Sequence, residues 1–283
     1  MKWQTCCVRW KGGDTGKESD TGKVRQMLSI LGFLTRFPVG RNARINDIAR
    51  VSYLFPAAGA LIGFSVAVFA SVISYFSSES SLNAVITLIF LYFITGLIHL
   101  DGLADFADGV FASGSVEDKI KAMKDEKVGI SGIFAVLSVV LLNIFALNSV
   151  FARSPSSQTA IVQFAQFFIV SEISAKLCMN SCMLFGKNAK LRAGMGAYFI
   201  ENFSYKKFFA STALSLFISS VVSLPFFPLY GFYRSLLVFT GFVIAFIVSG
   251  VSVRNLGAVS GDVIGASNEI ARCACFVLFA LLK

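Results

Sequence analysis

Residues 129–150 read GISGIFAVLSVVLLNIFALNSV and contain no charged side chain. An α-helix rises 1.5 Å per residue, so about 20 apolar residues cross the hydrocarbon core of a bilayer. Six other stretches come close to that length and hydropathy: 51–76, 82–100, 158–186, 208–227, 235–253 and 263–282. We therefore predict an all-α fold, a polytopic transmembrane helical bundle with about seven spans.

The composition supports a membrane protein over a soluble one. Hydrophobic residues make up 55% of the chain and charged residues only 14%, whereas soluble domains carry about 25% charged residues. The net charge is +9, but the lysines and arginines sit in the short connections between apolar stretches, as the positive-inside rule requires. This placement indicates a lipid bilayer as the partner and argues against nucleic acid.

The distribution of basic residues predicts the orientation. One side of the predicted bundle holds only Arg153, Arg234 and Lys283. The other side is much richer and holds Arg36, Arg41, Arg44, Arg50, Lys119, Lys121, Lys124, Lys127, Lys187, Lys190, Arg192, Lys206, Lys207 and Arg254. We expect the rich side to be cytoplasmic, which predicts a multi-pass protein of the cell membrane with a cytoplasmic N-terminus.

The N-terminal part differs from the rest of the chain. Residues 1–27 are predominantly polar and lack the apolar core of a signal peptide, so we predict a disordered extension. Residues 28–37 are apolar but too short to span, which favours a half-helix or an interfacial helix. Residues 28–283 are expected to form a single transmembrane catalytic domain.

An acidic motif follows the second predicted span, where residues 96–109 read GLIHLDGLADFADG. Asp101, Asp105 and Asp108 are spaced i, i+4 and i+7, which places the three carboxylates within about 60° on one helical face. Small and apolar residues between them indicate a packed segment and not merely an exposed acidic cap. A divalent cation would relieve their repulsion, and Mg²⁺ prefers such oxygen ligands. His99 could orient a carboxylate, contact a phosphate or simply satisfy a helix end.

A second polar motif opens the last predicted span, where residues 257–269 read GAVSGDVIGASNE. Asp262 and Glu269 are seven residues apart and share a helical face, with Asn268 nearby. Ionisable residues inside an apolar span are costly and usually functional. Arg272 could neutralise Glu269 at i+3, which would make this group an ion pair with a structural role.

Two further groups suit substrate contacts or structural roles. Residues 119–129 read KIKAMKDEKVG, a basic run that could lie on the lipid surface or, through Lys124 and Lys127, hold phosphates. In the fourth predicted span, Glu172 and Lys176 have the i, i+4 spacing of an intrahelical pair. The Gly-rich residues 188–201 could form a loop that contacts substrate. A zinc site is not expected, because His99 is the only histidine.

Four motifs together resemble the cobalamin synthase family, adenosylcobinamide-GDP ribazoletransferase. They are FLTRFPVG at 33–40, HLDGLADFADG at 99–109, MKDEKVG at 123–129 and GAVSGDVIGASNE at 257–269. The resemblance covers about residues 28–283 with the motif order intact. Lys127 and Lys176 stand where the family often has arginine, which keeps the charge but weakens a bidentate phosphate contact.

The resemblance implies a Mg²⁺-dependent transferase that joins adenosylcobinamide-GDP to α-ribazole, or to its 5′-phosphate, with release of GMP. It implies metal ligands and substrate contacts on the residues that match the family motifs. The implied metal ligands are Asp101, Asp105, Asp108 and Asp262, the implied bases are Asp108, Asp262 and Glu269, and the implied substrate contacts are His99, Lys124, Lys127 and Asn268. A homo-oligomer, or association with other cobalamin-assembly enzymes, is compatible with this function.

Two other functions fit less well. A CDP-alcohol phosphotransferase carries DG-x-x-AR, but residues 101–106 read DGLADF here, with Asp105 in place of the alanine and no arginine after it. A transporter would place its acids near the bilayer midplane and show inverted repeats. The acids are expected instead at helix ends, and the halves show no convincing repeat.

Overall fold

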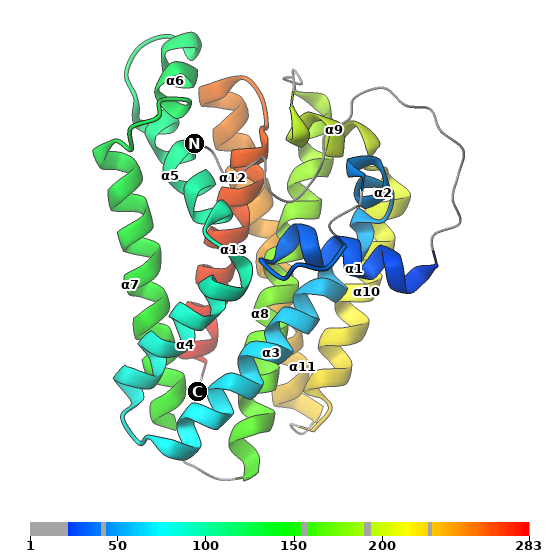
Figure 1. The fold of residues 1–283 in the computed structure, drawn as a ribbon, viewed down its shortest axis with the longest axis vertical. Helices are drawn as coiled ribbons and strands as arrows, with labels where there is room; N and C mark the ends of the chain where they lie inside the picture. Colours follow the sequence, from blue (N-terminus) through cyan, green and yellow to red (C-terminus); the bar gives the residue numbers. More distant parts are fainter. Residues whose placement is uncertain (1–21, 41–43, 154–157, 190–193, 226–227, 283) are drawn as a thin grey trace.

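The computed structural model describes residues 22–40, 44–153, 158–189, 194–225 and 228–282. Over these ranges the chain forms α-helices and short 3-10 helices without a β-strand, which confirms the all-α prediction (Figure 1). The helices are α1 (Lys23–Leu34), α2 (Ile45–Arg50), η2 (Ser52–Leu54), α3 (Phe55–Phe76), α4 (Ser80–Thr95), α5 (Ile98–Phe111), α6 (Val116–Met123), α7 (Ile130–Arg153), α8 (Gln158–Phe185), η3 (Gly186–Asn188), α9 (Met195–Asn202), α10 (Tyr205–Ser223), α11 (Pro228–Leu236), η4 (Leu237–Phe239), α12 (Thr240–Leu256) and α13 (Gly261–Leu281).

The described helices support a multi-pass membrane protein, but with fewer spans than the sequence predicted. Five are long and apolar enough to cross a membrane, or six if the bent pair α4 and α5 counts as one span. The predicted span 208–227 corresponds to α10, which is not among them. Lys206 and Lys207 lie in its first turn and its buried face carries a serine at every fourth position, and these polar residues lower the hydropathy of the helix. The serines are Ser211, Ser215, Ser219 and Ser223. The count of seven is therefore not confirmed.

The predicted span 82–100 is broken and not continuous. Helix α4 ends at Thr95, α5 begins at Ile98, and their axes differ in direction by 93°. Gly96 occupies the junction with φ = 73°, a left-handed conformation that glycine adopts without a steric penalty. A break inside a membrane exposes backbone groups that need partners. The Ile94 carbonyl accepts a hydrogen bond from the Arg36 backbone N–H at 2.7 Å, which satisfies one of them.

Helix α8 forms the centre of the bundle. Helices α3, α10, α12 and α13 pack against it (Figure 1). The approach of α3 is close: a Cβ at Gly63 would lie 2.6 Å from the Phe168 carbonyl oxygen. Small residues that let helix backbones meet are typical of membrane helix packing, because lipid removes the hydrophobic drive between helices. A helix in this position can carry charged residues that lipid never contacts.

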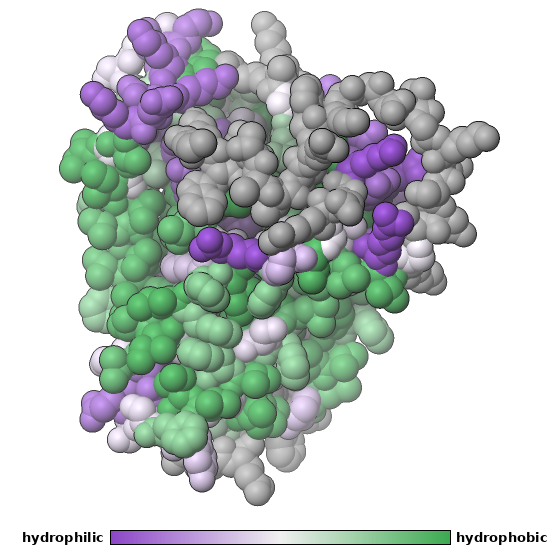
Figure 2. All heavy atoms as spheres, in the orientation of Figure 1, coloured by the Kyte–Doolittle hydropathy of each residue, from purple (hydrophilic) through white to green (hydrophobic). Residues whose placement is uncertain are grey.

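The surface has the character of a membrane protein. Figure 2 shows a broad apolar band over the side of the bundle and hydrophilic residues gathered at the end that carries α6. Large apolar side chains such as Phe134 on α7, which is 71% exposed, face outward. Helix α1 runs across the long axis of the bundle (Figure 1), as expected of an interfacial or half-helix. Helix α1 begins at Lys23, within the range predicted as an extension, and residues 1–21 lie outside the described residues.

Candidate functional site

The two acidic motifs of the sequence meet where α5 packs on the first turn of α13. A Cβ at Gly102 would lie 2.8 Å from the backbone oxygen of Asp262, so the two backbones are in direct contact. Asp101 is exposed, whereas Asp105 and Asp262 are half-buried. Because Asp101 and Asp105 both lie on the helix α5, their predicted position on one face is confirmed. The tertiary structure thus places three of the predicted ligands around one helix contact.

Helix α9 lies against the same end of α13. A Cβ at Gly196 would be 2.3 Å from the backbone nitrogen of Gly261, so the backbones touch there as well. The Gly-rich segment predicted as a loop ends in this helix, which starts after Gly194, a residue with φ = 128°. Arg192, which the sequence placed in that loop, lies outside the described residues. Helix α9 therefore meets the acidic site from the side of α13, and the prediction of a loop is wrong for residues 195–201.

Asp108 has a different environment from the other acids of its motif. Its Oδ2 accepts a hydrogen bond from the backbone N–H of Gly129, and its Oδ1 accepts one from Gly132, both at 2.7 Å. These amides belong to the start of α7, where free N–H groups and the helix dipole favour a negative charge. A Cβ at either glycine would lie less than 3 Å from an Asp108 oxygen. Asp108 therefore joins α5 to α7, and the pair of glycines at the start of a span was the sequence signal for it.

The basic run between α5 and α7 is mostly exposed. Lys124 and Lys127 are exposed in the connection from α6 to α7. Helix α6 begins with a capping box, in which hydrogen bonds from Ser115 lower the pKa of the exposed Asp118 carboxyl. Lys119 Nζ donates to Asn255 Oδ1 at 2.7 Å and so links α6 to α12. The predicted phosphate contacts of Lys124 and Lys127 stay predictions.

Few side chains at this site could bind Mg²⁺. Within the described ranges, no group of three or more His, Cys, Asp or Glu side chains is arranged to hold a metal ion. The assignment of Asp101, Asp105, Asp108 and Asp262 as ligands stays a prediction. Mg²⁺ commonly takes only one or two protein carboxylates and completes its shell with water and substrate phosphates. Asp101 and Asp105, one turn apart beside Asp262, supply donors of that kind.

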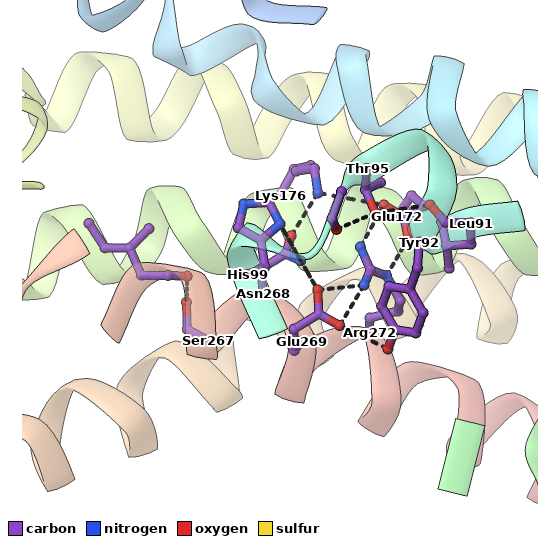
Figure 3. Close-up of polar contacts among 12 residues, drawn as sticks. Leu91, Tyr92, Thr95, His99, Glu172, Lys176, Ser267, Asn268, Glu269 and Arg272 are labelled. Atoms are coloured by element: carbon purple, nitrogen blue, oxygen red, sulfur yellow. Dashed lines mark hydrogen bonds and ion pairs between the residues drawn. The ribbon is translucent and has the colours of Figure 1, made fainter. Parts of the chain in front are cut away.

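A second group of polar residues lies deeper in the bundle and joins α4, α5, α8 and α13 (Figure 3). Tyr92 is half-buried, and the other members are buried. We call it the buried charge network, and it consists of Tyr92, His99, Glu172, Lys176, Asn268, Glu269 and Arg272.

Arg272 is the centre of this network. Its Nε donates to Glu172 Oε1 at 2.5 Å, and its Nη1 donates to both carboxylate oxygens of Glu269 at 2.6 and 2.7 Å. Lys176 Nζ lies 3.5 Å from Glu172 Oε2. Two carboxylates thus face two cations, and the charges compensate where water is excluded. Paired charges with several hydrogen bonds are the arrangement in which burial is tolerated.

Neutral residues extend the network to the broken helix. Asn268 Oδ1 accepts from Lys176 Nζ at 2.7 Å, while its Nδ2 donates to Glu269 Oε1 at 3.0 Å. The same Nδ2 lies 3.3 Å from His99 Nδ1, which accepts in the tautomer protonated at Nε2. The Tyr92 hydroxyl donates to Glu269 Oε2 at 3.2 Å. His99 Nδ1 therefore has a partner within the protein, and the predicted substrate contact of His99 stays a prediction.

The sequence predicted part of this network. The pairs Glu172–Lys176 and Glu269–Arg272 are confirmed. The Arg272–Glu172 contact between helices was missed, as was Tyr92, although a tyrosine inside an apolar stretch was a signal that could have revealed it. The expectation that the acids sit at helix ends does not hold for Glu172 and Glu269, which lie well inside α8 and α13.

Comparisons with known proteins agree with these motifs. The model of the family described as cobalamin-5-phosphate synthase matches residues 26–280. The chain is similar to the adenosylcobinamide-GDP ribazoletransferase of Methanococcoides burtonii, with 33% identity over 89% of this chain and 90% of the relative. It is 33% identical to that of Pyrococcus abyssi and 34% identical to that of Thermococcus gammatolerans, over 90% of this chain and 97% of each relative. No solved structure matches the chain.

Proposed function

The chain belongs to the cobalamin-5-phosphate synthase family, transferases of cobalamin biosynthesis, and on that basis we propose that it joins adenosylcobinamide-GDP to α-ribazole or α-ribazole 5′-phosphate. The observation that carries this proposal is the backbone contact between Gly102 and Asp262, which brings both acidic motifs to one place. A diphosphate substrate needs such a cluster of oxygen ligands if a divalent ion is to bind with it.

The reaction transfers a substituted phosphoryl group, the one that carries adenosylcobinamide. The 3′-hydroxyl oxygen of the ribazole attacks the phosphorus on the cobinamide side of the diphosphate. The bond from that phosphorus to the bridging oxygen breaks, and GMP leaves with the bond's electron pair. The hydroxyl proton passes to a base on the protein. The products are adenosylcobalamin, or its phosphate, and GMP.

Asp101 and Asp105 are the proposed main ligands of Mg²⁺, with Asp262 beside them. When bound, Mg²⁺ would neutralise negative charge on the diphosphate and on the departing GMP. Lys124 and Lys127, exposed near the same end of the bundle, would bind the phosphates. We propose that this end faces the cytoplasm, because it carries most of the lysines and arginines.

Asp262 is the proposed base. Of the three candidates, Asp108 already accepts a backbone hydrogen bond on each oxygen. Glu269 is held by Arg272 through both of its oxygens and lies deeper in the bundle. Asp262 is half-buried at the first turn of α13, next to the proposed ligands on α5. A base must reach the hydroxyl it deprotonates, and this position allows that contact best.

The test is GMP release by the purified protein in detergent with adenosylcobinamide-GDP, α-ribazole and Mg²⁺. We expect release only with all three present, and loss of release with a chelator. Asp101→Asn and Asp105→Asn should each abolish turnover while expression and membrane insertion stay normal. Near-normal turnover in either variant would contradict the ligand assignment. Turnover of a CDP-alcohol with a lipid acceptor, and none with the corrinoid, would contradict the function itself.

A further inference from the structure

The acid-bearing helix α5 does not inherit its position from α4. The axes of the two helices differ in direction by 93°, and Gly96 at the junction has φ = 73°. A continuous helix transmits orientation along its axis, but a break at a glycine does not. Asp101 lies about one turn into α5, and Asp105 lies about one turn further along. Contacts from other helices to both sides of the junction must therefore hold α5 where the acidic motifs meet.

The buried charge network supplies such contacts on both sides of the break (Figure 3). Before the break, the Tyr92 hydroxyl donates to Glu269 at 3.2 Å and accepts from Asn143 Nδ2 on α7 at 3.4 Å. After the break, His99 lies 3.3 Å from Asn268 Nδ2. Glu269 and Asn268 are neighbours on α13, so both halves of the broken helix are attached to the same turn.

That turn of α13 is itself held firmly. Arg272 binds Glu269 on its own helix and Glu172 on α8, and Lys176 on α8 binds Asn268. The side chains of Glu172, Lys176 and Arg272 have no exposure at all. Any shift of α13 against α8 would separate charges in a medium of low dielectric, where an unpaired charge is very unfavourable. The network therefore permits one arrangement of these helices.

We infer that the buried charge network positions α5 against α13 for the transfer reaction, with Tyr92 and Asn268 as positioning residues. This inference rests on the proposed function, since it concerns the same acidic site. Neither residue touches the substrate in this role. Tyr92 holds the end of α4 that leads into the junction, and Asn268 holds α5 through His99. Together they keep Asp101 and Asp105 beside the first turn of α13. A displacement of about 1 Å at a reacting centre can lower a rate by roughly a hundredfold.

The test uses Tyr92→Phe and Asn268→Leu. Both residues are uncharged, so neither substitution removes a charged group from the network. We expect kcat to fall by at least about tenfold, with KM for both substrates within about twofold of the wild type. The matched control is Thr87→Val, which removes a buried hydroxyl without a hydrogen-bond partner from the same helix as Tyr92. The control should keep wild-type kcat. Unchanged kcat in both test variants would overturn the inference, and so would a rise in KM without a fall in kcat.

A second measurement does not depend on activity. Hydrogen exchange of residues 98–111, measured by mass spectrometry in lipid nanodiscs, should be faster in Tyr92→Phe and Asn268→Leu than in the wild type and in Thr87→Val. Unchanged exchange in both test variants would overturn the inference even if turnover fell. Absence of GMP release from the wild type would contradict the proposed function instead, and exchange alone would then decide whether the network positions α5.

Discussion

Asp108 is the acid of the α5 motif for which the structure predicts the clearest effect of substitution. The change Asp108→Asn keeps the size of the side chain but replaces one acceptor oxygen by an NH₂ group. In the wild type, both oxygens of Asp108 accept hydrogen bonds from backbone amides of α7, at 2.7 Å each. One bond must therefore be lost, and the new NH₂ group faces a backbone N–H that also needs an acceptor.

The expected loss of stability follows from these contacts. A hydrogen bond to a charged group contributes about 1.5–3 kcal/mol. Interaction of the carboxylate with the start of a helix adds about 0.3–1 kcal/mol, which disappears with the charge. Asp108→Asn should therefore destabilise the fold by about 2–4 kcal/mol, a large share of the 5–15 kcal/mol that is common for folded proteins.

Thermal unfolding in detergent and Mg²⁺ titration of turnover together test this reasoning. We expect a melting midpoint at least about 4 °C below that of the wild type, and a Mg²⁺ concentration for half-maximal activity within about twofold of the wild type. Glu117→Gln, at an exposed position on α6, is the matched control and should leave both values unchanged. An unchanged midpoint with a Mg²⁺ requirement raised tenfold or more would refute the reasoning, because it would make Asp108 a metal ligand.

Two further perturbations test the helix contacts. Arg272→Met should destabilise the fold by about 3–5 kcal/mol, because it leaves two buried carboxylates without their shared partner. The additional change Glu269→Gln should restore part of that loss, as the folded fraction on size exclusion in detergent would show. Gly102→Ala should lower the melting midpoint and turnover, because its Cβ would lie 2.8 Å from the Asp262 backbone oxygen, and overpacking costs about 1–3 kcal/mol. Gly250→Ala, which meets open space in α12, should be neutral or stabilising.

Local patterns in the sequence were sufficient to predict apolar helical spans and contacts within one helix. The apolar stretch 129–150 became α7 because its length and composition match a bilayer, whatever its neighbours are. The pair Glu172–Lys176 followed from its i, i+4 spacing for the same reason. The family, which the comparisons confirm, was also readable from the chain alone.

The break in the span 82–100 could not be read from hydropathy. Apolar residues continue on both sides of Gly96, and a glycine alone does not determine whether a membrane helix continues or turns. The turn is supported by contacts from elsewhere, such as the Arg36 backbone N–H bound to the Ile94 carbonyl. Hydropathy measures only transfer into lipid, so it recognises an apolar segment but not its direction.

The sequence by itself determined that the chain is an all-helical membrane protein with two acidic motifs, because hydropathy and helical spacing are local properties. Only the tertiary structure decided how the acids divide: Asp108 binds the amides of α7, Glu172 binds Arg272 on α13, and Asp262 lies at the contact with α5. Their partners are distant in sequence or are backbone groups without side-chain identity. Folding alone brings such groups together, so no spacing along the chain encodes the pairing.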